Sequence, residues 1–193
     1  MSDLLIALLR AEKPQAVFGS HNTAGDATIL VAREHLVEVM QFLRDDPRCR
    51  MEQLIDVTVA DYLEYAPELR AQVSPCDADN RFGFTSARLP RFEVVYHLLS
   101  LSLHHRLRVK TFAPEDDAVV PSMCDLWIAA NWGEREAWDM LGVRFEGHPD
   151  LRRILTYPEF KGHPVRKDYP LRGYQPLIPM PELGHYTDQE NFR

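Results

Sequence analysis

The chain has no closely spaced pair of cysteines. Its three cysteines, Cys49, Cys76 and Cys124, lie far apart among 193 residues. Iron–sulfur clusters and structural zinc sites take their ligands from cysteines and histidines at short, regular spacings. The sequence therefore predicts neither kind of site, and reduced thiols in a cytoplasmic compartment are the simplest interpretation.

Other cofactor-binding signatures are also missing. The sequence contains no glycine-rich phosphate loop, no GxGxxG motif and no nucleophile elbow. A chain without a means of holding a cofactor is not expected to move electrons itself. We therefore expect no flavin, iron or zinc and no catalytic residue in this chain.

The sequence has fewer basic than acidic residues and no long apolar run. There are 22 Lys and Arg residues against 29 Asp and Glu, which gives a net charge of −7. Nucleic-acid binding needs a basic face, so a general nucleic-acid binder is disfavoured. No window approaches the roughly 20 apolar residues that cross a bilayer, and residues 1–10 lack the cleavage site of a secretory signal. Any membrane association is expected to come through partners.

Hydrophobic periodicity predicts the α+β class, with an antiparallel or mixed sheet flanked by helices. Helical patterns of apolar residues occur at 1–10 and 33–44. Patterns typical of strands occur at 27–32, 54–62, 92–100 and 107–112. The last two strands are expected to pair through a turn at 101–106, and the polar stretch 75–90 is expected to be a loop or an edge hairpin.

The longest helical segment is expected at 122–141. Ser122 can cap it, with Asp125 three residues later as in a capping box, and Gly142 can end it. Asn131–Gly133 in its middle predicts a break into two helices.

Three carboxylates, Glu134, Glu136 and Asp139, gather around Arg135 in this segment. On a helix, Arg135 and Asp139 lie one turn apart and are expected to pair across the surface. A catalytic interpretation would use Glu134 or Glu136 as a general acid or base. We favour a structural interpretation, in which the acids lie at the helix start and anchor basic side chains that follow in the sequence.

The tripeptide Gly-His-Pro occurs twice, at 147–149 and 162–164. Two histidines fifteen residues apart do not make a metal site without further ligands, and the spacing points to none. We expect turns instead, in which glycine supplies an unusual φ, proline fixes the bend and the histidine ring satisfies backbone groups.

Proline changes the character of the C-terminal part. Seven of the 14 prolines fall between Pro149 and Pro181, and such a segment cannot continue a helix or a central strand. Residues 144–172 carry seven Lys or Arg against four Asp or Glu, hence +3, and interleaved aromatic residues suited to an interface: Phe145, Tyr157, Phe160, Tyr169 and Tyr174.

We therefore expect an α+β domain at 1–142 and an extended proline-rich C-terminal arm at 143–193 that gains order on partner subunits. A salt-bridged clasp on an acidic partner is favoured. A solvated face and contact with phosphate or anionic lipid stay open as alternatives.

Two stretches carry a specific pattern. The first comprises Glu134-Arg135-Glu136, Asp139-Met140, Gly142, Phe145, Gly147-His148-Pro149 and Leu151–Leu155, and the second comprises Gly162-His163-Pro164 and Arg166–Leu171. Together they resemble the signature of the C subunit of the proton-pumping NADH:quinone oxidoreductase, respiratory complex I. The likeness covers roughly residues 30–175, and it departs from the family pattern at 157–160 and beyond Tyr174.

The resemblance implies a subunit without a redox centre, attached to the cytoplasmic face of a bacterial inner membrane only through the complex. FMN and iron–sulfur clusters would lie in partner subunits, and subunits D, B and I would be the neighbours. The complex would be a proton-translocating enzyme, while the isolated chain would be inert. The residues expected to dock partners are Glu134, Arg135, Glu136, Asp139, His148, Arg152, Arg153, His163, Arg166, Lys167 and Asp168.

Two further interpretations stay open. Membrane-bound hydrogenases and ferredoxin-dependent quinone reductases would contain an equivalent subunit. A stand-alone hydrolase would use Glu134, Glu136 and the histidines.

Overall fold

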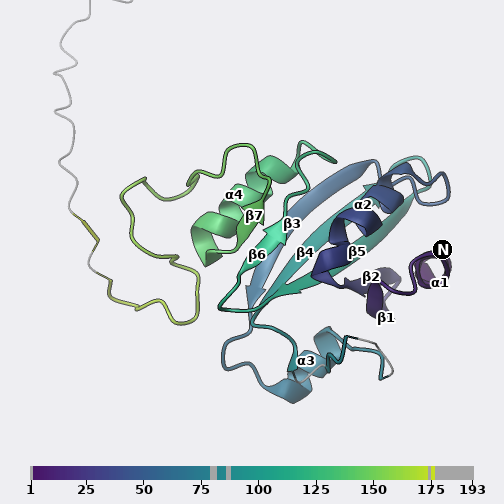
Figure 1. Cartoon of the computed structure of the whole chain (residues 1–193), viewed down its shortest axis with the longest axis horizontal. Coiled ribbons are helices and arrows are strands. Elements are labelled where there is room, and N and C mark those ends of the chain that lie inside the picture. The colour runs from purple at the N-terminus through teal and green to yellow at the C-terminus, as the bar shows by residue number, and fades with distance from the viewer. Residues whose placement is uncertain (1, 79–81, 86–87, 174, 177–193) are drawn as a thin grey trace, which may run out of the picture.

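A computed structural model describes residues 2–78, 82–85, 88–173, 175 and 176. A five-stranded mixed sheet lies at the centre, with α1, α2 and α4 on one side and α3 on the other (Figure 1). The expected α+β class is confirmed. The helices are α1 Ser2–Glu12, α2 Leu36–Asp45, preceded by the short 3-10 turn Arg33–His35, α3 Pro67–Val73 and α4 Ala130–Leu141. The strands are β1 Val17–Thr23, β2 Asp26–Val31, β3 Gln53–Asp61, β4 Phe92–Ser100, β5 His105–Ala113, β6 Val119–Pro121 and β7 Arg144–Glu146.

The sheet has the order β1-β2-β5-β4-β3. Strands β3, β4 and β5 are antiparallel neighbours, with α3 in the connection from β3 to β4. The pairing of β4 with β5 agrees with the sequence prediction, whereas β2 lies parallel to β5. Strand β1 was missed because only its first residues are apolar and its end is exposed, as befits an edge strand. The seven-residue helix α3 was also missed.

The main core lies between the sheet and the helices α1, α2 and α4. Four apolar residues of α2 recur at helical spacing and are buried: Leu36, Val39, Met40 and Leu43. In the part of the chain that the structure describes, no helix is long and apolar enough to span a membrane.

The segment after α3 covers part of the opposite face of the sheet. Phe18 and Phe112 form a small core there, against which Phe82 and Phe84 pack. The described residues of 75–90 contain no strand, which agrees with the expected loop.

Strand β3 keeps only part of the expected period-two pattern. A bulge between Leu54 and Asp56 turns Ile55 outward, so that this residue is 50% exposed while Val57 and Val59 point into the core. A prediction from the sequence pattern therefore places Ile55 on the buried face of the strand, whereas the residue is half exposed.

The expected start of the long helix and its expected break are both wrong. Helix α4 begins at Ala130, and Ser122 and Asp125 lie before it, Asp125 in a turn. The helix runs through Asn131–Gly133 without interruption. Gly133 is needed for close packing, because an added Cβ would lie 3.0 Å from Cβ of Val57 on β3. Gly142 ends the helix with φ +81°, as predicted.

A buried ion pair joins α3 to the sheet. The side chains of Lys110 and Glu93 are 4% and 2% exposed, and their N and O atoms lie 2.9 Å apart. Lys110 also donates to the carbonyl of Val73 at the end of α3, and Glu93 accepts a hydrogen bond from Ser74. The pair thus fixes the α3 segment against β4 and β5.

Replacing Lys110 alone should leave the Glu93 carboxylate buried without its cation. We expect Lys110→Met to lower the free energy of unfolding by about 3–5 kcal/mol in urea titrations of the full chain. The double variant Lys110→Met/Glu93→Met should recover much of this loss, because it buries no lone charge. Arg106→Met, at an exposed position of the same strand, serves as the control. A Lys110→Met loss no larger than that of the control would contradict this assignment.

Candidate partner-docking site

The residues singled out from the sequence surround α4. Residues 147–173 of the C-terminal arm contain no helix or strand and lie against α4 and the lower end of the sheet (Figure 1). The beginning of the arm belongs to the domain, since β7 pairs in parallel with β6. The described part of the arm therefore lies against its own domain.

The first Gly-His-Pro motif fastens the arm to the start of α4. Gly147 has φ +82°. Nδ1 of His148 accepts a hydrogen bond from the N–H of Asp150 at 3.0 Å, so the proton is on Nε2, which donates to the carbonyl of Asn131 at 3.2 Å. Asn131 lies in the first turn of α4.

The second Gly-His-Pro motif fastens the arm to the end of the same helix. Gly162 has φ +86°. Nδ1 of His163 lies 3.0 Å from the carbonyl of Asp139, and the N–H of Val165 donates to the carbonyl of Met140 at 3.0 Å. These carbonyl groups belong to the last turn of α4, where backbone carbonyls have no hydrogen-bond donors within the helix. The turn interpretation of both motifs is confirmed, and together they hold both ends of α4.

Asp139 is the main anchor of the arm. Its side chain is fully buried and accepts hydrogen bonds from Arg153 at 2.6 Å and from the Thr156 hydroxyl at 2.5 Å. It also accepts from the N–H groups of Ile154, Leu155 and Thr156 at 2.8–3.0 Å. Burial opposes ionisation, but the bonds from Thr156, Leu155 and Arg153 hold the pKa of Asp139 well below its usual range.

The expected ion pair between Arg135 and Asp139 is wrong. Arg135 instead donates to the carbonyls of Arg152 and Arg153, at 3.1 and 3.3 Å. Asp139 points to the buried side of α4, where five donors from the arm surround its carboxylate. Both residues therefore hold the arm, and the expected anchoring of a basic arm side chain is confirmed for Asp139.

Glu134 anchors the segment that leads into α4. Its buried carboxylate accepts hydrogen bonds from the Ser122 hydroxyl at 2.6 Å and from the N–H of Met123 at 2.7 Å. Burial raises the pKa of Glu134 to about 7. Glu134 lies beyond the first turn of α4, so the expectation that the acids begin the helix is wrong. A hydrolase would need this carboxylate to reach a substrate, and its burial speaks against that alternative.

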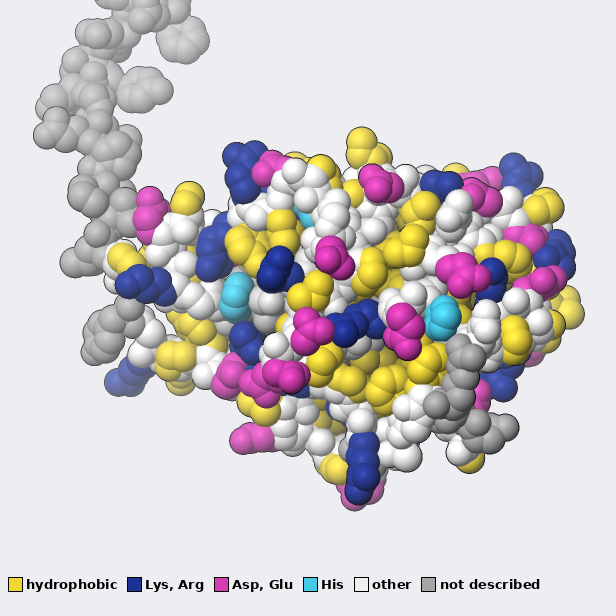
Figure 2. All heavy atoms as spheres, in the orientation of Figure 1, with side chains coloured by type: hydrophobic (Ala, Val, Ile, Leu, Met, Phe, Trp, Pro, Cys, Tyr) yellow, Lys and Arg dark blue, Asp and Glu magenta, His cyan; other side chains and the backbone are white. Residues whose placement is uncertain are grey.

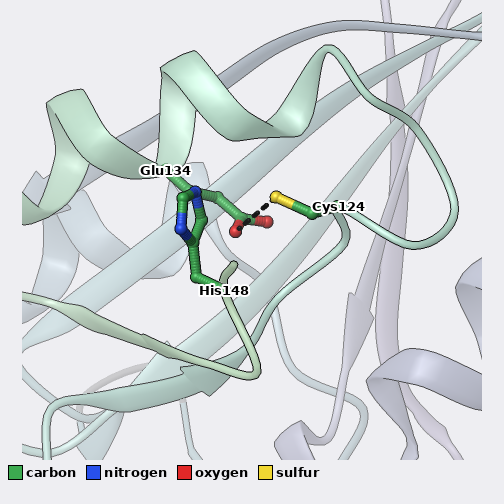
Figure 3. A group of neighbouring side chains, drawn as sticks. All are labelled: Cys124, Glu134 and His148. Atoms are coloured by element: carbon green, nitrogen blue, oxygen red, sulfur yellow. Dashed lines mark hydrogen bonds between the residues drawn. The ribbon is translucent and has the colours of Figure 1, made fainter. Parts of the chain in front are cut away.

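Glu134 also belongs to a group with Cys124 and His148 whose potential ligand atoms lie within 4.8 Å of one another. Figure 3 shows the imidazole and the thiol on either side of the carboxylate. Both nitrogens of His148 are engaged with backbone groups, and burial raises the pKa of the Cys124 thiol to about 11. The thiol lies 3.6 Å from the carboxylate and donates to it. The Cys124 thiol and Nε2 of His148 thus act as hydrogen-bond donors, and Nδ1 of His148 accepts a hydrogen bond. His148 therefore presents no free lone pair to a metal.

A second anchor holds the arm farther along. The buried guanidinium of Arg91 binds Asp61 through two hydrogen bonds of 2.8 and 2.7 Å and pairs with Asp168 of the arm at 3.0 Å. The N–H of Lys167 donates to Asp61 at 2.9 Å. Burial opposes ionisation of Asp61, but the bonds from Arg91 and the backbone lower its pKa to about 2. Arg91 also pairs with Glu115.

Sequence reasoning missed this second anchor. Asp61 falls two residues after Val59, on the inward-facing side of β3. An acid at an inward position of a strand signals a buried cation, because an unpaired charge is costly there. That signal was present in the sequence, whereas nothing in the sequence identified Arg91 as its partner.

Basic and aromatic side chains of the arm pack mainly within the chain. Arg153 lies over the rings of Trp138 and Phe160, and Arg166 lies over Phe92. Phe160 stacks with Tyr169. Arg153 and Arg166, which the sequence analysis expected to contact a partner, thus contact aromatic rings of their own chain. Tyr174 lies outside the described residues.

Eight of the eleven expected docking residues have side chains that hold the chain's own α4, arm or adjacent strands: Glu134, Arg135, Asp139, His148, Arg153, His163, Arg166 and Asp168. The side chains of Glu136, Arg152 and Lys167 are exposed, although Arg152 pairs with Asp150. Figure 2 shows basic, acidic and apolar side chains mixed over the region of α4 and the arm.

The raised pKa of Glu134 predicts a pH dependence. Because its folded pKa, about 7, lies above its ordinary value of 4.5, its stabilising contribution is present below pH 4.5 and is lost as pH rises through 7. Glu134→Gln mimics the protonated form at all pH values. We expect the free energy of unfolding of the native chain, relative to Glu134→Gln, to fall by about 3 kcal/mol between pH 4.5 and 8. Urea titrations across this range measure the difference, and a constant difference would refute the assignment.

Comparison with known proteins agrees with this architecture. Residues 29–175 match the sequence model of the family described as the respiratory-chain NADH dehydrogenase, 30 Kd subunit. The C subunit of the NADH-quinone oxidoreductase of Hyphomonas neptunium is 45% identical over 174 residues, which cover 90% of this chain and 74% of that protein. The C subunit of the Verminephrobacter eiseniae enzyme is 48% identical over 150 residues, and the match covers 77% of this chain and 66% of that protein.

Two solved structures are similar to this chain. A trypsin-resistant fragment of Nqo5 superposes with a TM-score of 0.59 and 30% identity, over 77% of this chain and 98% of the fragment. A chain of an archaeal membrane-bound sulfane sulfur reductase has a TM-score of 0.63 at 22% identity, over 88% of this chain and 85% of that one, and shows the shared fold. The chain therefore belongs to the family of the 30 kDa subunit of the respiratory-chain NADH dehydrogenase.

Proposed function

We propose that this chain is the scaffolding C subunit of a proton-translocating NADH:quinone oxidoreductase and joins subunits D, B and I. Electrons would pass from NADH to quinone through FMN and iron–sulfur clusters of the partner subunits. The chain would lie on the cytoplasmic face of a bacterial inner membrane and would touch the membrane only through the complex. Family membership supports the assignment.

The observation that carries the scaffold role is the use made of the signature residues. Asp139 and Glu134 are both buried. Asp139 accepts hydrogen bonds from the arm, and Glu134 accepts them from the segment that leads into α4. They shape a rigid surface and do not face a substrate. Glu136, Arg152 and Lys167 stand outside these internal contacts, and they are the expected docking residues best placed to meet a partner.

We also propose that the α+β domain folds without the arm, as a unit of residues 1–146. The sequence predicts the boundary at 142, and we place it at the end of β7 because β7 pairs with β6. The trypsin-resistant fragment of Nqo5, which matches 77% of this chain, supports an independently folded unit of this kind.

Loss of the Asp139 charge should impair assembly before it impairs chemistry. Asp139→Asn keeps the side-chain volume but leaves Arg153 without its anion. This loss should lower the free energy of unfolding by about 3–5 kcal/mol. We expect native gels of membranes to show less assembled complex, while NADH:quinone turnover per assembled complex stays unchanged. Glu159→Gln, at an exposed acid of the arm, is the matched control. A complex that assembles normally but loses quinone reduction would overturn the scaffold assignment.

Truncation before Gly147 should separate folding from docking. The shortened chain keeps both strands of the β6–β7 pair and the main core, so we expect one cooperative melting transition by circular dichroism. Its melting temperature should be lower, because Asp139 loses its donors from the arm and Arg91 loses Asp168. Binding to the D subunit in a pull-down should collapse. A truncated chain that binds as well as the full chain would exclude docking through the arm.

A further inference from the structure

A stripe of largely apolar side chains runs along the outer face of α4. Trp132 and Glu136 lie one turn apart on this face, and Met140 follows one turn later. Ile128, in the turn that leads into the helix, precedes Trp132 by four residues. The side chains of Ile128 and Trp132 stand far out of the domain, since the two residues are 90% and 69% exposed. Tryptophan is enriched at the energetic centres of protein interfaces, so this face has the composition of a docking surface.

The C-terminal half of the stripe borders an open groove of about 240 Å³. Three parts of the chain line this groove: Val57 of β3, Met140 of α4 and Val165 of the arm. Glu136 lies at the same groove and is exposed. The N–H of Val165 donates to the carbonyl of Met140 at 3.0 Å, so the arm supplies one wall. The shape of the groove therefore depends on the position of the arm against α4.

The Glu136 carboxylate lacks a counter-ion among the described residues, where it forms neither an ion pair nor a hydrogen bond. Arg135, its neighbour in sequence, instead donates to the carbonyls of Arg152 and Arg153. An unpaired acid beside apolar walls suits a Lys or Arg side chain. The methylene stem of such a side chain covers apolar surface, and its charged group meets the carboxylate.

Charge disfavours two other occupants. The chain's own tail carries the wrong sign, because residues 177–193 contain Glu182, Asp188 and Glu190 against one arginine. A second copy that docked through the same stripe would bring two Glu136 carboxylates together across a two-fold axis. Such a contact between like charges costs free energy. A different chain that carries a basic side chain fits the groove better than either.

We propose that a partner subunit docks on this face of α4 and inserts one Lys or Arg side chain into the groove. The aliphatic part of that side chain packs against Met140 and Val165, and its charged group pairs with Glu136. Apolar side chains beside it cover Trp132 and Ile128. The proposal rests on the role in a multisubunit complex given above. It also explains why the arm must be fixed against α4, since the arm completes the groove.

Charge reversal at position 136 tests the ion pair. Because Glu136→Lys places like charges together, the tagged full-length variant should recover about tenfold less of the other subunits from cells that make the whole complex. Glu136→Gln should recover an intermediate amount, with less sensitivity to salt than the native chain. Both isolated variants should melt within a few degrees of the native chain. Glu68→Lys, at an exposed acid of α3, is the control, and equal recovery with both lysine variants would contradict the ion pair.

A bulky residue in the groove tests its occupation without a change of charge. Val165→Trp keeps the backbone N–H that binds Met140 and fills the space beside Glu136. This variant should also recover about tenfold less of the other subunits, because the inserted side chain loses its place. Val37→Trp, at an exposed valine of α2, is the matched control. If both tryptophan variants recover the native amount, the groove is empty in the complex and the proposal is wrong.

The exposure of Trp132 decides the matter even where a variant unfolds. Hydroxyl-radical labelling of the native chain, measured by mass spectrometry, should oxidise Trp132 readily in isolation and much less in the complex. Trp127, which is 6% exposed, is the buried reference. Equal labelling of Trp132 in both states would overturn the proposal. So would protection in isolation that disappears when residues 177–193 are removed, or that grows with concentration, because the tail or a second copy would then be the occupant.

Failure of the proposed function and failure of the groove contact are distinguishable. A native chain that recovers no other NADH dehydrogenase subunit overturns the proposed function and this inference with it. A native chain that recovers them, together with a folded Glu136→Lys variant that recovers them equally well, overturns the groove contact alone.

Discussion

The fixed position of the C-terminal arm depends on one buried carboxylate. Residues 147–173 form no helix or strand, so their backbone N–H groups need acceptors elsewhere. Asp139 accepts three consecutive N–H groups, at Ile154–Thr156, and neutralises Arg153 in the same place. A neutral side chain could supply neither the charge nor as many acceptor sites. The ion pair of Arg91 and Asp168 holds the far part of the arm in a similar way.

This anchoring defines the outer surface of α4. The two Gly-His-Pro turns hold its ends, and Gly142 leaves room for the second turn, because a Cβ there would lie 2.6 Å from the ring of His163. With its ends and its buried side fixed, the helix presents Glu136 toward the groove beside β3. The signature residues thus largely make internal contacts, and these contacts give a fixed shape to the docking surface that we propose.

The parts of the fold that follow from local pattern could be predicted from the sequence. Helix α2 and strands β4 and β5 were predicted because their apolar residues repeat at the spacing of the element. Strand β1 and the start of α4 were not, since tertiary contacts decide them: β1 is a polar edge, and Ser122 donates to Glu134 instead of capping a helix. Likewise, a spacing of four residues suggested that Arg135 pairs with Asp139, while the arm supplies better donors to that carboxylate. Residues 61, 91 and 168 lie too far apart in sequence for any local pattern to show their contacts.

The arm is held by its own domain, and we propose that it thereby offers a ready surface to partner subunits. Amide hydrogen exchange of Ile154, Leu155 and Thr156 in the isolated full-length chain tests this claim most directly. We predict that these three amides are protected to a degree comparable with those of α4, because each donates to buried Asp139. Exchange at the rate of an unfolded peptide would contradict the claim, because the arm would then take its place only on a partner.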